Sequence, residues 1–288
     1  MRVVVVGDVG LDIVARHDEP IVYGGDARAA VNVTGGGAGA NTALWLRDRG
    51  TDTTLVARVG DDAGGRLLRG ELEAAGVRCA FAIDPETPTC CVVVLVDAEG
   101  QRTMLPDRGA NKRFQPSDVT ASALEGATHL HLSGYVLLDP SSRQGGLEAL
   151  ALARRLGLTT SVDPQAAALL TDPQAFLDDV RGVDLLLPNA DELRALTGSE
   201  EPEAARSLLG TVGAVAVTFG LRGAAWVDGD GIVVAPAEDV PCVDSTGAGD
   251  AFDAGVITGW LRGGAPEAIL AQGATLGARA VSKVGAQP

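Results

Sequence analysis

The sequence predicts an α/β protein in which helices cover both faces of a mainly parallel central sheet. Short apolar runs alternate with helical stretches through most of the 288 residues. Such alternation is typical of parallel sheets, because the crossover between two parallel strands usually runs through a helix. Apolar residues make up 46% of the chain, which is enough for the large core that this fold requires.

The predicted strands are short apolar or β-branched runs, at residues 3–6, 54–59, 129–132, 159–162, 184–187, 214–218 and 224–227. The predicted helices lie mostly between them, at residues 40–49, 65–75, 146–156, 175–180, 191–196, 204–209, 247–261 and 266–281. Gly50 and Gly76 follow the first two helices, as glycine often does at a helix end.

Two segments break this alternation and have no helix of their own. Residues 13–34 surround the turn Tyr23-Gly-Gly-Asp26, and residues 89–106 read as a hairpin that turns at Asp97-Ala-Glu-Gly100. We interpret them together as a small β-sheet lid inserted in a single domain of residues 1–288. Residues 90–96 are apolar on both faces, which favours a homodimer through the lid, although a lid packed on its own domain would also bury one face.

Composition and charge narrow the classes of function. The net charge of −15 argues against nucleic acid or anionic membrane surfaces as partners, and in favour of a small-molecule substrate held by local donors. The four cysteines form no C-x-x-C pair, which disfavours a zinc site or a disulfide framework. The apolar run at residues 1–7 is too short for a signal peptide or a membrane span, so we expect a cytoplasmic protein.

The most informative segment is Asp244-Ser-Thr-Gly-Ala-Gly-Asp-Ala-Phe252, which leads into a helical stretch. The first N–H groups of a helix lack partners and can hold an anion, and small residues at 247–249 let a phosphate come close. Asp250 beside such an anion could take the proton from an alcohol that attacks a phosphate. The alternative is an aspartate that only complements the helix dipole.

Two N-terminal motifs offer groups that could bind a polyol. Asp12 follows the first strand, and ligands of parallel sheets bind beyond the carboxyl ends of strands; alternatively, it forms a turn. The glycine cluster from Gly35 to Asn41 lacks both the Lys-Ser/Thr ending of a P-loop and the G-x-G-x-x-G spacing. It therefore fits close approach to a small polyol better than a nucleotide, with the Asn41 amide bonding hydroxyl groups.

The remaining motifs each have a purely structural alternative. Asn189 and Glu192 have the spacing of a capping box. The turn from Thr218 to Gly223 offers donors for a nucleotide or simply joins two strands. His129 and His131 share a strand face but lack a third metal ligand, and Ser133 lacks the context of a catalytic triad.

In chain order, these motifs resemble the ribokinase-like family of carbohydrate and nucleoside kinases. They read G-D-x-x-x-D, G-G-x-x-x-N, N-x-x-E, T-x-G-x-x-G and D-S-T-G-A-G-D-A-F, and the resemblance spans the chain from Val3 to Pro288. It implies a three-layer α/β/α sandwich with a β-lid. It also implies transfer of the γ-phosphoryl group of ATP, with Mg²⁺, to a hydroxymethyl group of a small sugar or sugar acid. A nucleoside kinase of the same family and a non-catalytic ATP- or sugar-binding regulator stay open.

The resemblance also implies roles for individual residues. Asp250 matches the general base, and the backbone N–H groups of Gly247, Ala248 and Gly249 match the anion hole. The positions that hold the acceptor are Asp12, Gly36, Gly37, Asn41 and Arg102. The ATP contacts are Asn189, Thr218, Gly220 and Gly223, and Glu192 orients Mg²⁺ through water. A loop for a monovalent cation such as K⁺ comprises Asp244 and Thr246 with the backbone of Ala280, Lys283 and Gly285.

Departures from the family pattern leave the acceptor open. Ala38 stands where ribokinases carry Lys, and Gly39 stands where fructokinases tend to carry Pro. The chain ends at Pro288, just short of the Ser that often completes the cation site in ribokinases. Arg102 matches a position that several sugar kinases use near the acceptor, and a surface arginine is the alternative.

Overall fold

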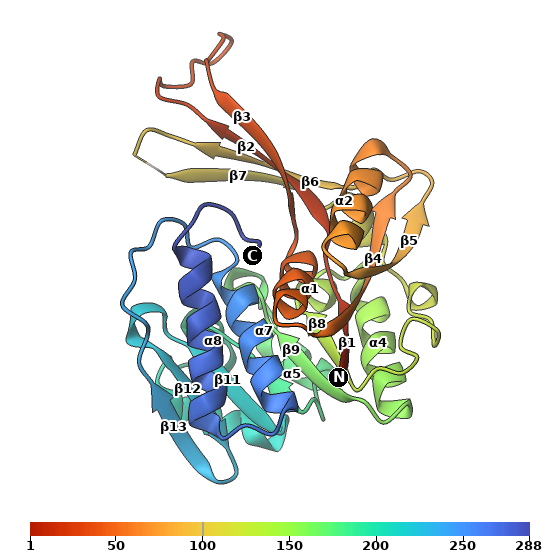
Figure 1. Cartoon of the computed structure of the whole chain (residues 1–288), viewed down its shortest axis with the longest axis vertical. Helices are drawn as coiled ribbons and strands as arrows, with labels where there is room; N and C mark the ends of the chain where they lie inside the picture. Colours follow the sequence, from red (N-terminus) through yellow and green to blue (C-terminus); the bar gives the residue numbers. More distant parts are fainter. Residues whose placement is uncertain (100) are drawn as a thin grey trace.

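The main element of the computed structural model is a nine-stranded sheet in the order β13-β12-β11-β10-β9-β8-β1-β4-β5 (Figure 1). The structure describes residues 1–99 and 101–288, except for the side chain of Arg102. The strands are β1 (Arg2–Val6), β4 (Asp52–Gly60), β5 (Arg78–Asp84), β8 (His129–Ser133), β9 (Thr159–Asp163), β10 (Leu185–Leu186), β11 (Ala214–Thr218), β12 (Ala224–Asp228) and β13 (Gly231–Ala235). All pair in parallel from β5 to β11, and β12 and β13 are antiparallel.

Helices pack on both faces of this sheet. One face carries α1 (Ala38–Asp48), α2 (Ala63–Ala74), α7 (Ala248–Leu261) and α8 (Pro266–Val281). The other carries α3 (Tyr135–Leu138), α4 (Arg143–Arg155), α5 (Pro173–Asp179), α6 (Ala190–Thr197) and the 3-10 helix η4 (Pro202–Gly210). Shorter 3-10 helices span Gly109–Arg113, Pro116–Asp118, Ala167–Leu169 and Gly220–Arg222. The predicted three-layer α/β/α class is confirmed.

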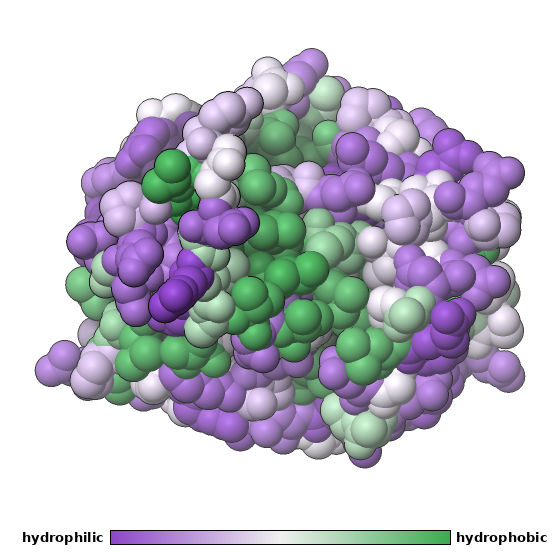
Figure 2. All heavy atoms as spheres, turned by 90° about the horizontal axis from the view of Figure 1, so that it is seen from above, coloured by the Kyte–Doolittle hydropathy of each residue, from purple (hydrophilic) through white to green (hydrophobic). Residues whose placement is uncertain are grey.

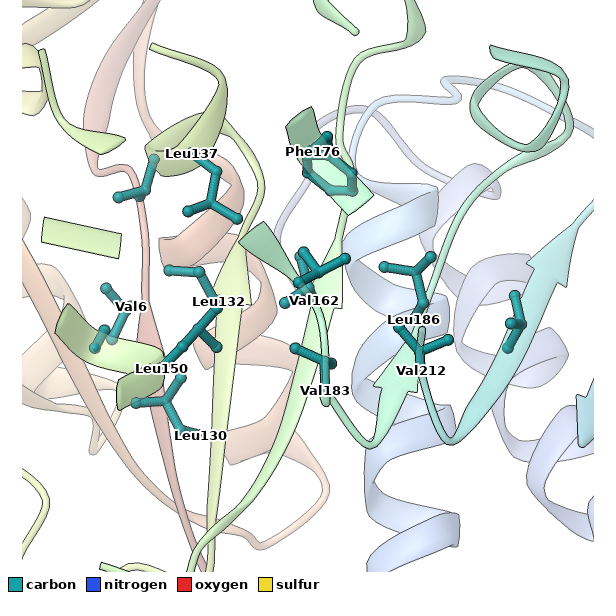
Figure 3. Close-up of a cluster of buried hydrophobic side chains, with 14 of the residues drawn as sticks. Val6, Leu130, Leu132, Leu137, Leu150, Val162, Phe176, Val183, Leu186 and Val212 are labelled. Carbon is teal, nitrogen blue, oxygen red and sulfur yellow. The ribbon is translucent and has the colours of Figure 1, made fainter. Parts of the chain in front are cut away.

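The valines of β1 show why both faces are covered. Side chains alternate along a strand, so Val3 and Val5 join the core under α1 and α7, whereas Val4 and Val6 join the core under α4. Figure 3 shows the second of these cores, where Val6, Leu132 and Leu150 meet. Burial of each such side chain contributes about 1.5–3 kcal/mol relative to exposure.

The sequence-based assignment of elements differs from the structure in several places, including α3, which was not predicted. The helix expected at residues 204–209 is the 3-10 helix η4. Strands β5 and β13 were not predicted. Both are edge strands of the large sheet and only partly buried, so neither has the continuous apolar pattern of the central strands.

A second, four-stranded sheet has the order β3-β2-β6-β7. It consists of β2 (Gly10–Arg16), β3 (Ala30–Gly36), β6 (Cys90–Val96) and β7 (Arg102–Asp107), of which β2 and β6 pair in parallel. It lies beyond the end of the large sheet at which β1 passes into β2 (Figure 1). These strands cover much of the two segments expected to form the lid, and the role of the sheet as a lid stays a prediction. In the described part of the chain, no helix has the length and apolarity needed to cross a membrane.

Candidate active site

Helix α7 begins with an open N-terminus. Gly247 caps the helix with φ of 73°, and a Cβ there would lie 2.5 Å from the Cβ of Ala286, so only glycine fits without a shift. No side chain caps α7. Gly249 is exposed, and a Cβ built there would meet nothing within 4 Å. The start of α7 therefore leaves room for an anion near its first N–H groups.

Asp250 lies in the first turn of α7, and its side chain is buried. The Asn41 amide, from α1, donates a hydrogen bond of 2.9 Å to its Oδ2 atom. Two predicted site residues 209 positions apart thus meet. Burial raises the pKa of Asp250 to about 6, against the lowering effect of hydrogen bonds from Asn41 and Gln165. A carboxylate with this pKa is a stronger base than an ordinary aspartate and is still ionised at neutral pH.

The glycine loop packs tightly against the turn between β1 and β2. A Cβ on Gly37, whose φ is 96°, would lie 2.5 Å from the carbonyl oxygen of Asp8. A Cβ on Gly36 would collide with the carboxylate of Asp12, so these two predicted acceptor residues are in contact. Asp12 is partly buried, and burial raises its pKa. The glycines thus have a packing role in addition to the predicted approach of a polyol.

Arg108 neutralises Asp8 beside this loop. Its guanidinium group donates at 2.9 Å to Asp8 Oδ2 and lies 3.4 Å from Asp139. Burial raises the pKa of Asp8, and the charge of Arg108 counteracts that rise.

Sequence reasoning missed a group of acidic residues around Asp250. Asp163 at the end of β9 and Asp253 in α7 are both buried, and each carboxyl group affects the pKa of the other. Burial and the neighbouring negative charges raise both pKa values well above the ordinary range, which favours a protonated carboxyl group in this pair. The second carboxylate oxygen of Asp253 is buried without a hydrogen-bond partner among the described residues.

Gln165 connects this group to Asp250. Its backbone N–H donates at 2.8 Å to Asp163, its side-chain amide also donates to Asp163, and the same amide lowers the pKa of Asp250. Gln165 has φ of 73°, the one non-glycine residue with positive φ in the described chain. Backbone strain of this kind is often found at functional sites. The sequence signal was Asp163-Pro-Gln165 directly after a predicted strand, where parallel sheets bind ligands.

Asn189 and Glu192 do form a capping box at the start of α6. The Asn189 side chain accepts from the Glu192 N–H at 3.0 Å, and Glu192 accepts from the Asn189 backbone at 2.9 Å and from its amide at 2.7 Å. Burial raises the pKa of Glu192 to about 7. Asn189 is exposed and forms an isolated bridge with Thr218, so the two predicted ATP contacts are adjacent. Gly220 and Gly223, with φ of 59° and 94°, form the turn from β11 to β12.

The predicted cation loop is partly assembled. Asp244 Oδ1 accepts from Thr246 N at 2.9 Å and from Thr246 Oγ1 at 2.7 Å, and Oδ2 accepts from Gly285 N at 3.0 Å. The Val281 carbonyl accepts from Asp244 N at 3.2 Å. Ala280 is buried in the last turn of α8, and the Lys283 ammonium lies 5.6 Å from the centre of the Trp45 ring.

A cleft of about 320 Å³ separates the smaller sheet from the C-terminal loops. Its lining includes Asp12, Asn32 and Met104 on the sheet, with Asp244 and Gly285 opposite. The side chain of Arg102, predicted to bind the acceptor, lies outside the described residues.

The histidines have no catalytic arrangement. His129 bonds Thr159 and Ser161, and His131 bonds Ser161, at 2.8–2.9 Å. Burial lowers the pKa of both to about 3, so they stay neutral in the core. Among the described residues, no three His, Cys, Asp or Glu side chains are placed to ligate a metal directly.

Comparison with known proteins identifies the family of the chain. Residues 1–288 match the model of the pfkB family of carbohydrate kinases. An ATP-dependent ribose-1-phosphate kinase from Halopiger xanaduensis is 33% identical over 290 residues, covering 100% of this chain and 94% of the relative.

Two solved structures share the fold over 99% of this chain. The adenosine kinase from Sinorhizobium meliloti has a TM-score of 0.87 and 25% identity over 95% of its own chain. A ribokinase II candidate from E. coli, solved with ATP and Mg²⁺, has a TM-score of 0.88 and 24% identity over 94% of its chain. The chain therefore belongs to the pfkB family of carbohydrate kinases, the ribokinase-like family that its motifs resemble, and is a phosphotransferase with an alcohol group as acceptor.

Proposed function

We propose that the protein transfers the γ-phosphoryl group of ATP to a hydroxymethyl group of a small sugar or sugar acid, with Asp250 as general base. The observation that carries this proposal is the buried Asp250 carboxylate in the first turn of a helix that no side chain caps. A base and an anion site on the same helical turn are the two parts that in-line phosphoryl transfer requires.

The residues around Asp250 have different roles in the proposed phosphoryl transfer. The Asn41 amide holds the Asp250 carboxylate in one orientation, at 2.9 Å. Asp250 takes the proton of the attacking hydroxyl group, and the backbone of Gly247, Ala248 and Gly249 stabilises the charge on the transferred phosphoryl group. Asp12, Gly36 and Gly37 hold the acceptor. Positioning supplies most of the acceleration, because phosphoryl transfer needs little covalent chemistry from the protein.

ATP would lie along Asn189, Thr218, Gly220 and Gly223, at the carboxyl ends of β10 and β11. The bridge between Asn189 and Thr218 supports a continuous surface there, and the open space at Gly220 leaves the backbone accessible. The structural relative solved with ATP and Mg²⁺ supports the same pair of ligands for this chain.

The donor set near Asp250 fits Mg²⁺. Buried carboxyl groups of Asp163, Glu192 and Asp253 supply oxygen atoms, and one oxygen of Asp253 has no partner among the described residues. Mg²⁺ prefers oxygen ligands and usually keeps several waters while it binds phosphates, so it needs no cage of three direct protein ligands. Glu192 would hold it through water, and the ion would neutralise phosphate charge. We assign K⁺ to the loop of Asp244, Thr246 and the backbone near Ala280, Lys283 and Gly285.

The cleft favours a sugar over a nucleoside. The described side chains in its middle are aliphatic, with Val14, Val94 and Met104 and no aromatic ring for a base to stack on. The ribose-1-phosphate kinase relative also points to a sugar derivative, whereas the adenosine kinase keeps a nucleoside as the second candidate.

We further propose that two copies of the chain associate through the smaller sheet. Figure 2 views the molecule from the side of this sheet and shows a broad hydrophobic area. Val31, Val33 and Leu105 on its edge strands are at least half exposed. An exposed apolar sheet face of this kind is typical of an interface. The cytoplasmic location expected from the sequence stays a prediction.

The test is an assay of ATP consumption with a panel of sugars, sugar acids, sugar phosphates and nucleosides. We expect Mg²⁺-dependent turnover with at least one sugar derivative and a product phosphorylated on its hydroxymethyl group. Saturable ATP binding without turnover on any acceptor would contradict the proposal and favour a non-catalytic regulator. Exclusive use of nucleosides would replace the sugar with the second candidate.

A further inference from the structure

Arg16 is the one cationic side chain among the described residues that line the cleft. It lies on β2, is exposed, and has no carboxylate of the described residues within ion-pair distance. By contrast, Arg108 nearby is paired with both Asp8 and Asp139. The net charge of the chain is −15, so an unpaired arginine that faces a ligand cleft needs an explanation.

The position of Arg16 relative to Asp12 suggests a ligand of defined length. The two residues are four apart on β2 and both line the cleft, so their side chains share one face of the sheet. A strand rises about 3.3 Å per residue, which places their Cα atoms about 13 Å apart. The cleft of about 320 Å³ that both residues line has room for one small sugar derivative.

The polarity of the side chains on the cleft face changes between Asp12 and Arg16. Asp12 pairs with Thr34 next to the glycine loop, at the end where hydroxyl groups would bind. Val14 and Val94 make the middle aliphatic, and Asn32 opposite Val14 adds one amide. Arg16 stands at the far end opposite Ala30 and Val96. The cleft is therefore acidic at the acceptor end and basic at the other.

We propose that Arg16 binds an anionic group at the end of the acceptor opposite the phosphorylated hydroxymethyl group. The inference rests on the proposed function, because it requires a sugar whose hydroxymethyl group is free. The anion must then sit at the other end, as the phosphate of a sugar 1-phosphate or the carboxylate of a sugar acid. The planar guanidinium group matches either anion with two parallel hydrogen bonds.

The experiment measures kcat/KM for four acceptors: ribose 1-phosphate, 2-dehydro-3-deoxygluconate, ribose and fructose. The proteins are wild type, Arg16→Gln, Arg16→Lys and the control Arg206→Gln. Arg206 is also exposed but lies on η4, outside the lining of the cleft, and its replacement removes the same charge. Circular dichroism checks that each variant is folded.

We expect wild type to prefer one anionic acceptor over both neutral sugars. Arg16→Gln should lower kcat/KM for that acceptor by about 10- to 100-fold, the usual effect of a charged hydrogen bond, and leave neutral sugars within about threefold. Arg16→Lys should retain part of the kcat/KM for the anionic acceptor that Arg16→Gln loses, and Arg206→Gln should behave as wild type. If Arg16→Gln lowers kcat/KM for ribose 1-phosphate, Arg16 binds a phosphate; if it lowers kcat/KM for 2-dehydro-3-deoxygluconate, Arg16 binds a carboxylate.

Two results would overturn the inference while the proposed function stands: a wild type that uses only neutral acceptors, or an Arg16→Gln variant that loses activity equally on neutral and anionic ones. A wild type without turnover on any acceptor would overturn the proposed function itself, together with this inference.

Discussion

The start of α7 and the cleft face of the smaller sheet are built differently. At the start of α7, Asp250 and its partner Asn41 are buried and hydrogen-bonded, on helices packed against the large sheet. On the smaller sheet, Arg16 is exposed and unpaired within the described structure, and the edge strands β3 and β7 expose large apolar side chains. The difference fits the proposals that the packed region carries out the chemistry, which tolerates little change, and that the exposed sheet selects the acceptor.

Gly249→Ala tests the anion site of the packed region and should have a large effect on turnover. A methyl group would enter the open space beside the first turn of α7, where the phosphoryl group is proposed to bind. We expect kcat to fall by about 10²-fold, the scale of damage to one anion-hole donor. The control is Gly70→Ala in α2, whose Cβ also meets nothing within 4 Å. Both should fold at least as stably as wild type, since alanine favours helix. Normal turnover in Gly249→Ala would contradict the anion hole.

Asp250→Asn should stabilise the fold, because a buried functional carboxylate is costly. Its pKa is raised from 3.8 to about 6, so the folded chain holds this proton more tightly than the unfolded chain. The stability of wild type should therefore fall as pH rises from 4 to 6, and the variant should lack that loss. Relative to wild type, the free energy of unfolding of the variant should be higher by up to about 3 kcal/mol above pH 7 and unchanged below pH 4. Denaturant unfolding of both proteins at pH 4 and pH 8 measures this difference in stability. An equal difference at the two pH values would contradict the effect of burial on Asp250.

Leu105→Glu tests the exposed sheet and should have the smallest effect on turnover. Leu105 is 56% exposed on β7, and a charge there should oppose association through this sheet. We expect a shift from dimer to monomer in analytical ultracentrifugation, with kcat within about twofold of wild type. The control, Leu156→Glu, adds the same charge at the 47% exposed end of α4. If both variants keep the mass of wild type, the proposed interface is wrong.

The sequence could predict the fold and most of the motif positions, because both leave local signals. Alternation of apolar runs indicated the parallel sheet, and glycine-rich turns indicated where Gly37 and Gly247 adopt positive φ. Asp163 left a signal, as a polar residue directly after a predicted strand, but its pairing with Asp253 left none, because the pair forms only when the end of β9 meets α7. The unpaired state of Arg16 depends likewise on how the second sheet stands over the C-terminal loops.

The capping box of Asn189 and Glu192 shows a second limit of prediction from sequence spacing. Asn189 and Glu192 have the spacing of both a helix cap and a nucleotide motif, and the structure contains the cap. The spacing of these residues could not separate the two roles, because one arrangement is compatible with both. The cap fixes Glu192 in the interior, and Asn189 stays exposed beside Thr218.

Asp250 alone, rather than the acidic group as a whole, is proposed to act as the general base. The most direct test compares single-turnover phosphoryl transfer and ATP affinity in Asp250→Asn and Asp253→Asn, since both aspartates are buried in α7 one turn apart. We predict that Asp250→Asn lowers turnover by roughly 10²–10⁴-fold with ATP affinity nearly unchanged, and that Asp253→Asn loses at most about tenfold. Turnover near wild type in Asp250→Asn, or an equal loss in the two variants, would contradict the account.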